Sequence, residues 1–169
     1  YGVVGSHVNL CGRIESYTTG GQILISPQTR EMVGCTLEVA QELEVFPKGV
    51  KGSLILSQIT AIGQPYNLSC GTEAGDEQML AVHIPVRFKR ISEKHCSETE
   101  YDGVLTAMNG RYAVMKTPIS IPLFENISLC ADNEVFWKVL RADDQGVLLG
   151  FTAGHQEFCA RMMGAVAEK

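Results

Sequence analysis

Hydrophobic positions in the first 62 residues shift between a helical and an alternating period, which predicts short helices and strands in turn. A helix is expected after Ser6, a good N-cap residue, and Gly20-Gly21 is expected to stop it. Its apolar stripe is formed, at helical spacing, by Leu10, Ile14 and Tyr17. The other elements expected here are a strand at 22–25, a helix at 26–33 capped by Ser26, and strands at 37–39, 43–46 and 53–62.

Beyond residue 79 the alternation typical of half-buried strands dominates the pattern. Pro85 interrupts the first of these strands, and a proline without an N–H predicts a sheet edge or a bulge there. Asn109-Gly110 predicts a two-residue hairpin turn. The expected elements are strands at 80–91, 103–108, 111–117, 126–130, 135–141 and 147–152, and a final helix at 156–166. Six short strands and a terminal helix predict a small closed or nearly closed β-barrel.

A polar, acidic and glycine-containing stretch separates these two patterns. Its composition is typical of a linker, so we expect one unit at residues 1–68, a linker at 69–78 and a second unit at 79–169. The chain begins at Tyr1 inside a patterned segment, which favours a piece of a longer protein. The fold class predicted for the whole chain is α+β.

Composition limits the classes of partner. The 169 residues are 45% hydrophobic and 20% charged, as in a globular protein, and the formal net charge is −5. An acidic chain gives no electrostatic reason to expect a nucleic acid or an anionic membrane as partner. No apolar run reaches the length of a membrane span, and the six cysteines form no Cys-x-x-Cys pair, so no membrane segment and no metal site are expected here.

Asn9 and Arg13 are the first candidate functional residues. They are four positions apart, so on a helix their side chains lie one above the other on the same face. An amide above a guanidinium makes a clamp for ribose and phosphate, because the arginine fork matches phosphate oxygens. The same spacing is also typical of an ordinary solvated helix face, and the spacing alone favours that simpler interpretation.

The surrounding sequence favours the clamp. Two runs, Val8-Asn9-Leu10-Cys11-Gly12-Arg13-Ile14-Glu15-Ser16 and Gly20-Gly21-Gln22-Ile23-Leu24-Ile25-Ser26, closely resemble the C-terminal part of the catalytic domain of class III adenylate/guanylate cyclases. That family's pattern reads V-N-x-x-x-R-x-E followed by G-Q-I-x-x-S. The resemblance continues through Leu43-Glu44-Val45-Phe46 and the Lys51-Gly52 turn to Gly63. It covers residues 1–66, about the last third of such a domain.

The cyclase resemblance implies a function and a site. It implies part of a ferredoxin-like α/β sandwich that converts ATP or GTP to a 3′,5′-cyclic nucleotide and pyrophosphate in cytoplasmic signal transduction. Asn9 and Arg13 match the family's transition-state residues, and Gly2 falls at the base-selecting position, where it offers no side chain. The aspartates that hold Mg²⁺ or Mn²⁺ belong to segments preceding Tyr1. Since the family's sites lie across a head-to-tail homodimer, this chain alone is expected to be inactive.

The second half resembles a PilZ-like domain, a six-stranded barrel that binds cyclic di-GMP through an R-x-x-x-R arm and a D/N-x-S-x-x-G motif. Arg87, Arg90 and Asn109 are the candidate contacts to that ligand. Both motifs depart from the family pattern: the two arginines are three apart, and no Asp-x-Ser precedes Gly110. A degenerate interaction or regulatory module therefore stays open as the alternative function.

Overall fold

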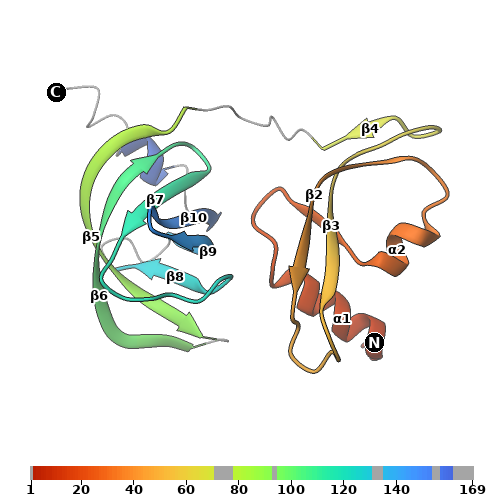
Figure 1. Cartoon of the computed structure of the whole chain (residues 1–169), viewed down its shortest axis with the longest axis horizontal. Coiled ribbons are helices and arrows are strands. Elements are labelled where there is room, and N and C mark those ends of the chain that lie inside the picture. Colours follow the sequence, from red (N-terminus) through yellow and green to blue (C-terminus); the bar gives the residue numbers. More distant parts are fainter. Residues whose placement is uncertain (1, 71–77, 93–94, 131–134, 154–156, 162–169) are drawn as a thin grey trace. The chain divides into compact units, whose positions relative to one another are not determined.

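The computed structural model describes residues 2–70, 78–92, 95–130, 135–153 and 157–161. The chain divides into two compact units, Tyr1–Gly75 and Asp76–Lys169 (Figure 1). Both are built mainly from antiparallel strands with few helices, so the fold is α+β as predicted. No helix in the described ranges is long and apolar enough to cross a membrane.

The first unit is an antiparallel sheet with two short helices. Its sheet has the strand order β1-β3-β2, and β4 also pairs with β3. The elements are α1 (Ser6–Glu15), β1 (Ile23–Ile25), α2 (Pro27–Met32), β2 (Leu37–Val45), β3 (Leu54–Ile62) and β4 (Leu68–Ser69). The two strands expected at 37–39 and 43–46 are one strand, because β2 continues through bulges near Val39 that break the alternation of the sequence.

The two helices begin differently. Ser26 caps α2 as predicted, and its hydroxyl accepts a hydrogen bond from the Thr29 amide at 3.2 Å. The prediction that Ser6 caps α1 is wrong: Gly5 is the cap residue, because its carbonyl accepts the first helical hydrogen bond, from the Asn9 amide at 3.0 Å. Ser6 is therefore already inside the helix.

The end of α1 also differs from the prediction. The helix ends at Glu15, before Gly20-Gly21. Ser16 Oγ donates to the Arg13 carbonyl at 2.6 Å, and Thr18 Oγ1 donates to the Glu15 carbonyl at 2.7 Å. Side-chain hydroxyls thus bind carbonyls at the end of the helix and compete with its continuation.

The first unit buries few of its large apolar side chains and exposes many of them. The buried apolar residues described in it are Ile14, Val45, Leu56 and Ile59. Its exposed large apolar residues are Val3, Val4, Val8, Ile23, Met32, Phe46, Ile55, Tyr66 and Leu68. Exposed apolar side chains in this number leave apolar surface available for a protein contact.

The second unit is a closed antiparallel barrel, as predicted, with the strand order β10-β7-β6-β5-β8-β9. Figure 1 shows β5 and β6 as long, curved strands. The strands are β5 (Leu80–Ser92), β6 (His95–Met108), β7 (Tyr112–Lys116), β8 (Asn126–Leu129), β9 (Phe136–Asp143) and β10 (Gly146–Ala153). Residues 157–161, the described part of the expected final helix, are helical.

An aromatic cluster fills one part of the barrel core. Trp137 is 1% exposed, and its ring lies edge-on to Phe151 and Phe158 at centroid distances of 5.2 and 5.7 Å. Phe88 is fully buried in the same core. Phe158 and the buried Cys159 thus connect the described part of the terminal helix to the barrel core.

Two details of the β5–β6–β7 region differ from the sequence prediction. β6 begins at His95 and not at Gly103, because its polar first half continues to pair with β5. The Asn109-Gly110 hairpin exists, but its turn lies one residue later. The Asn109 amide donates to the Tyr112 carbonyl at 2.9 Å, and Asn109 Oδ1 accepts from the Arg111 and Tyr112 amides.

Candidate functional site

α1 brings Asn9 and Arg13 to one face, one turn apart, as the sequence predicts. Asn9 is exposed and Arg13 is half-buried. Within the described part of the chain, neither side chain has a hydrogen-bond or ion-pair partner. An unpaired arginine fork beside an unpaired amide leaves donors that can bind phosphate or ribose oxygens.

The Arg13 guanidinium lies beside the turn between β2 and β3. Gly49 lies in this turn with φ +78°, and a Cβ placed on it would lie 3.5 Å from Arg13 Nη2. The residue at this position therefore limits where the guanidinium can lie. Gly2 is exposed, and a Cβ placed on it would contact nothing within 4 Å.

The described ranges hold no group of three or more His, Cys, Asp or Glu side chains that could hold a metal ion. Asn9 and Arg13 carry an amide and a guanidinium, which bind anions and hydroxyls.

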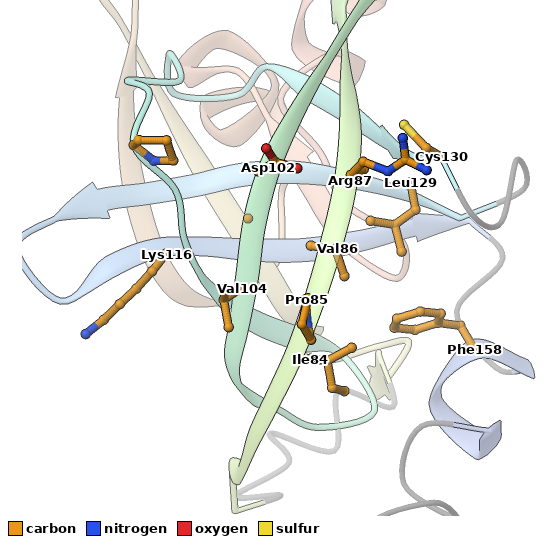
Figure 2. Close-up of a pocket in the computed structure, with 12 residues that line it drawn as sticks. Ile84, Pro85, Val86, Arg87, Asp102, Val104, Lys116, Leu129, Cys130 and Phe158 are labelled. Carbon is orange, nitrogen blue, oxygen red and sulfur yellow. The ribbon is translucent and has the colours of Figure 1, made fainter.

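A second candidate site lies in the barrel, where a cavity of about 570 Å³ opens between β5 and the terminal helix (Figure 2). Figure 2 shows the Phe158 ring directed toward Ile84 and Leu129, while the Lys116 side chain extends away from them. Its lining residues are mainly apolar: Ile84, Pro85, Val86, Arg87, Asp102, Gly103, Val104, Lys116, Pro118, Leu129, Cys130 and Phe158. A volume of this size is typical of a pocket for a small organic ligand.

Incomplete strand pairing creates this cavity. β8 pairs with β5 only from Phe88 to Ile91, and one further bond joins the Cys130 amide to the Arg87 carbonyl at 2.8 Å. Among the residues that the structure describes, the first half of β5 pairs with β6 alone. Pro85 lies in this half and carries no N–H, so this edge has no unpaired donor at that position. The edge or bulge predicted from Pro85 is thus confirmed, with a bulge nearby between Ala81 and Ile84.

Charged side chains lie at one side of the cavity. Arg87 Nη1 donates to Glu100 Oε2 at 2.9 Å, and Lys89 Nζ lies 3.7 Å from Glu100 Oε1. Burial raises the pKa of the Cys130 thiol, and the nearby Glu100 carboxylate raises it further. Cys130 is therefore a poorer nucleophile at neutral pH than an exposed thiol.

The three cyclic-dinucleotide candidates are not brought together. Arg90 is held by Glu125, with Nε–Oε1 at 2.5 Å and Nη2–Oε2 at 2.7 Å, and this pair raises the Arg90 pKa. Asn109 is buried in the β6–β7 turn. Asn109 lies seven residues after Asp102, and Asp102 is the residue opposite Arg87 in the register of β5 and β6. Seven residues of strand span roughly 20 Å. Only Arg87 of the three lines the cavity.

The Arg90–Glu125 pair makes a testable contribution to stability. Glu125→Gln is expected to lower the free energy of unfolding by about 2 kcal/mol, because it removes a two-point charged contact whose Glu125 side chain is only 11% exposed. Urea denaturation followed by circular dichroism measures it. The control Glu100→Gln, in an exposed pair, should cost less than about 1 kcal/mol. Equal losses in both variants would contradict this role.

Sequence reasoning found Asn9 and Arg13 but not the barrel cavity. The signal that could have found the cavity is Pro85, since it predicted a free edge without saying what faces that edge. In comparisons with known proteins, no family model and no curated protein matches this chain.

Proposed function

We propose that the first unit is the C-terminal part of a class III nucleotidyl cyclase catalytic domain, acting in cytoplasmic signalling. The observation that carries the proposal is the unpartnered Asn9–Arg13 pair on one face of α1, backed by the β2–β3 turn. In a solvated helix face the arginine is usually exposed. Here Arg13 is half-buried and still has no partner in the described residues, as in a site shaped to receive an anion.

The order of elements supports the proposal. After the helix with Asn9 and Arg13 come β1, α2, β2, a tight turn and β3, which ends directly before Gly63. The resemblance leads one to expect the last part of this series, a strand, a K-G turn and a final strand that ends in glycine. Gly52 in that turn has φ +83°, a conformation that favours glycine. We infer a partial α/β sandwich of the cyclase type.

The chemistry of the two side chains fits the reaction. Two metal ions, bound by carboxylates that this proposal places outside the chain, would activate the ribose 3′-hydroxyl and neutralise the triphosphate. Arg13 would donate to oxygens of the α-phosphate as negative charge develops there, and Asn9 would hold the ribose. Contacts that strengthen in the transition state accelerate the reaction more than contacts to the bound substrate.

The exposed apolar surface of the first unit supports a composite site. A unit that leaves Ile23, Ile55 and Phe46 in solvent has apolar area available for further strands or a second subunit. We propose a head-to-tail homodimer in which Asn9 and Arg13 face metal-binding aspartates of the other subunit. This chain alone would then carry half of each site and would not cyclise nucleotides.

The test is cyclase activity of a chain that carries this segment together with metal-binding aspartates, assayed with Mn²⁺ and either ATP or GTP. Formation of the 3′,5′-cyclic nucleotide with either substrate supports the proposal. A folded dimer that produces none with both substrates contradicts it.

The second candidate is an interaction or regulatory module that has lost catalysis. Gly2 favours it, because a glycine cannot read a purine at the base-selecting position. Sensing of a cyclic dinucleotide by the barrel is disfavoured, since Glu125 already occupies the Arg90 guanidinium. Micromolar binding of cyclic di-GMP in a calorimetric titration would reverse that preference.

A further inference from the structure

We propose that the barrel cavity is a binding site for an amphipathic anion, a linear apolar chain that carries one carboxylate. This site belongs to the second unit and uses neither Asn9 nor Arg13, so it is independent of the cyclase proposal. The site is formed mainly by the half of β5 that does not pair with β8, by the end of β8 and by Phe158.

The residues that line the cavity favour a ligand with an apolar chain. Ile84 and Val86 lie on one face of β5, which packs against the barrel core, and Leu129 and Phe158 lie across from β5 (Figure 2). Ile84 and Val86 are half-buried, so an apolar ligand would remove their remaining exposed surface from water. A polar ligand would gain few hydrogen bonds from such a wall.

Arg87 selects the charged head. Its side chain is 68% exposed, and only Nη1 is used, in the bond to Glu100. In the described part of the chain Nε and Nη2 have no partner, and together they present the two parallel donors that bind a carboxylate. The charged residues that line the cavity are Arg87, Lys116 and Asp102, two cations and one carboxylate. The charge therefore favours an anion.

The chain supplies its own reporter. Trp137 is the single tryptophan, and its ring contacts Phe158, which lines the cavity. A ligand that contacts Phe158 is expected to change the Trp137 emission. Binding can therefore be followed in the unmodified chain.

The experiment titrates the whole chain with saturated monocarboxylates of 8 to 14 carbons, below their micelle concentrations, by Trp137 fluorescence and calorimetry. We expect affinity to rise about fourfold per added methylene until the cavity is full. A specific ligand should also raise the melting temperature, because it binds the folded state. Absence of binding, or binding that lowers the melting temperature as a detergent does, would overturn the proposal.

A substitution of Arg87 tests the contact to the carboxylate head group. Arg87→Gln is expected to weaken dodecanoate binding about fivefold and to leave binding of 1-dodecanol unchanged, because only the carboxylate contacts the guanidinium. Arg141→Gln is the matched control, since Arg141 is also exposed and ion-paired, with Asp143, but does not line the cavity. Equal effects of the two arginine variants would overturn the assignment of the head group.

Val86→Phe is expected to weaken binding of both dodecanoate and dodecanol at least tenfold by filling the cavity between β5 and Phe158. Val4→Phe is its control, because Val4 is 90% exposed and lies in the other unit. Unchanged binding by a folded Val86→Phe variant would overturn the location. If that variant does not fold, the chain-length series and Arg87→Gln still decide the proposal.

Discussion

Arg13→Ala is expected to reduce cyclase turnover at least about 100-fold in a chain that also carries the metal-binding aspartates. Removing a donor that stabilises developing charge typically costs about 3 kcal/mol of transition-state stabilisation. Because the contact strengthens in the transition state, kcat and kcat/KM should fall together while KM changes little. Asn9→Ala should have a similar effect. Initial rates with Mn²⁺ and the preferred nucleotide measure both.

Arg30→Ala is the matched control. Arg30 is an exposed arginine on α2 in the same unit, and its guanidinium binds Glu42 and Ser57 within the sheet. Its loss should leave turnover within about twofold, because surface ion pairs contribute little. The account of Arg13 would be wrong if Arg13→Ala kept wild-type turnover, or if Arg30→Ala lost as much as Arg13→Ala.

Trp137→Ala is expected to lower the free energy of unfolding of the barrel by about 4 kcal/mol. The side chain is 1% exposed and contacts Phe151 and Phe158, so truncation leaves a large cavity in the core. Urea denaturation followed by circular dichroism measures the change. Leu123→Ala serves as control, because Leu123 is 56% exposed in the same unit and should cost less than about 0.5 kcal/mol.

Trp137→Phe separates packing from hydrogen bonding. The buried Nε1 of Trp137 has no hydrogen-bond partner within the described residues. Phenylalanine keeps an aromatic ring and removes this donor, so we expect a loss of only about 1 kcal/mol. A loss as large as that of Trp137→Ala would show that the indole N–H is satisfied and contributes to stability.

The sequence predicts this fold well where one local signal decides the backbone. The Ser26-Pro27 pair predicts the start of α2, and Asn109 predicts the β6–β7 hairpin, because each acts through bonds to residues nearby in the chain. The barrel strands follow from alternation, since one face of each packs into a common core.

The misses occur where a neighbouring strand overrides the local pattern. The first half of β6 is too polar to look like a buried strand, yet it pairs with β5 at His95 and Cys96 and again, after a register shift, from Glu100 to Asp102. β2 contains bulges that disturb its alternation. In both cases pairing between strands holds a segment whose own sequence does not predict it.

The candidate site is predictable only in part. The spacing of Asn9 and Arg13 fixes their shared helix face, but the backing of Arg13 by Gly49 depends on how the β2–β3 turn folds back. The Arg90–Glu125 pair joins residues 35 positions apart, which no local pattern indicates. For the same reason the barrel cavity, built from β5, β6, β8 and Phe158, is visible only in the structure.

The central claim is that this chain carries one half of a composite cyclase site, and complementation tests it most directly. This chain is mixed with a class III cyclase subunit that keeps its metal-binding aspartates but has alanine at its own Asn and Arg positions. We predict that neither partner alone forms cyclic nucleotide, that the mixture does so with Mn²⁺, and that Arg13→Ala abolishes the gain. A stable mixed dimer without activity for either ATP or GTP would contradict the account.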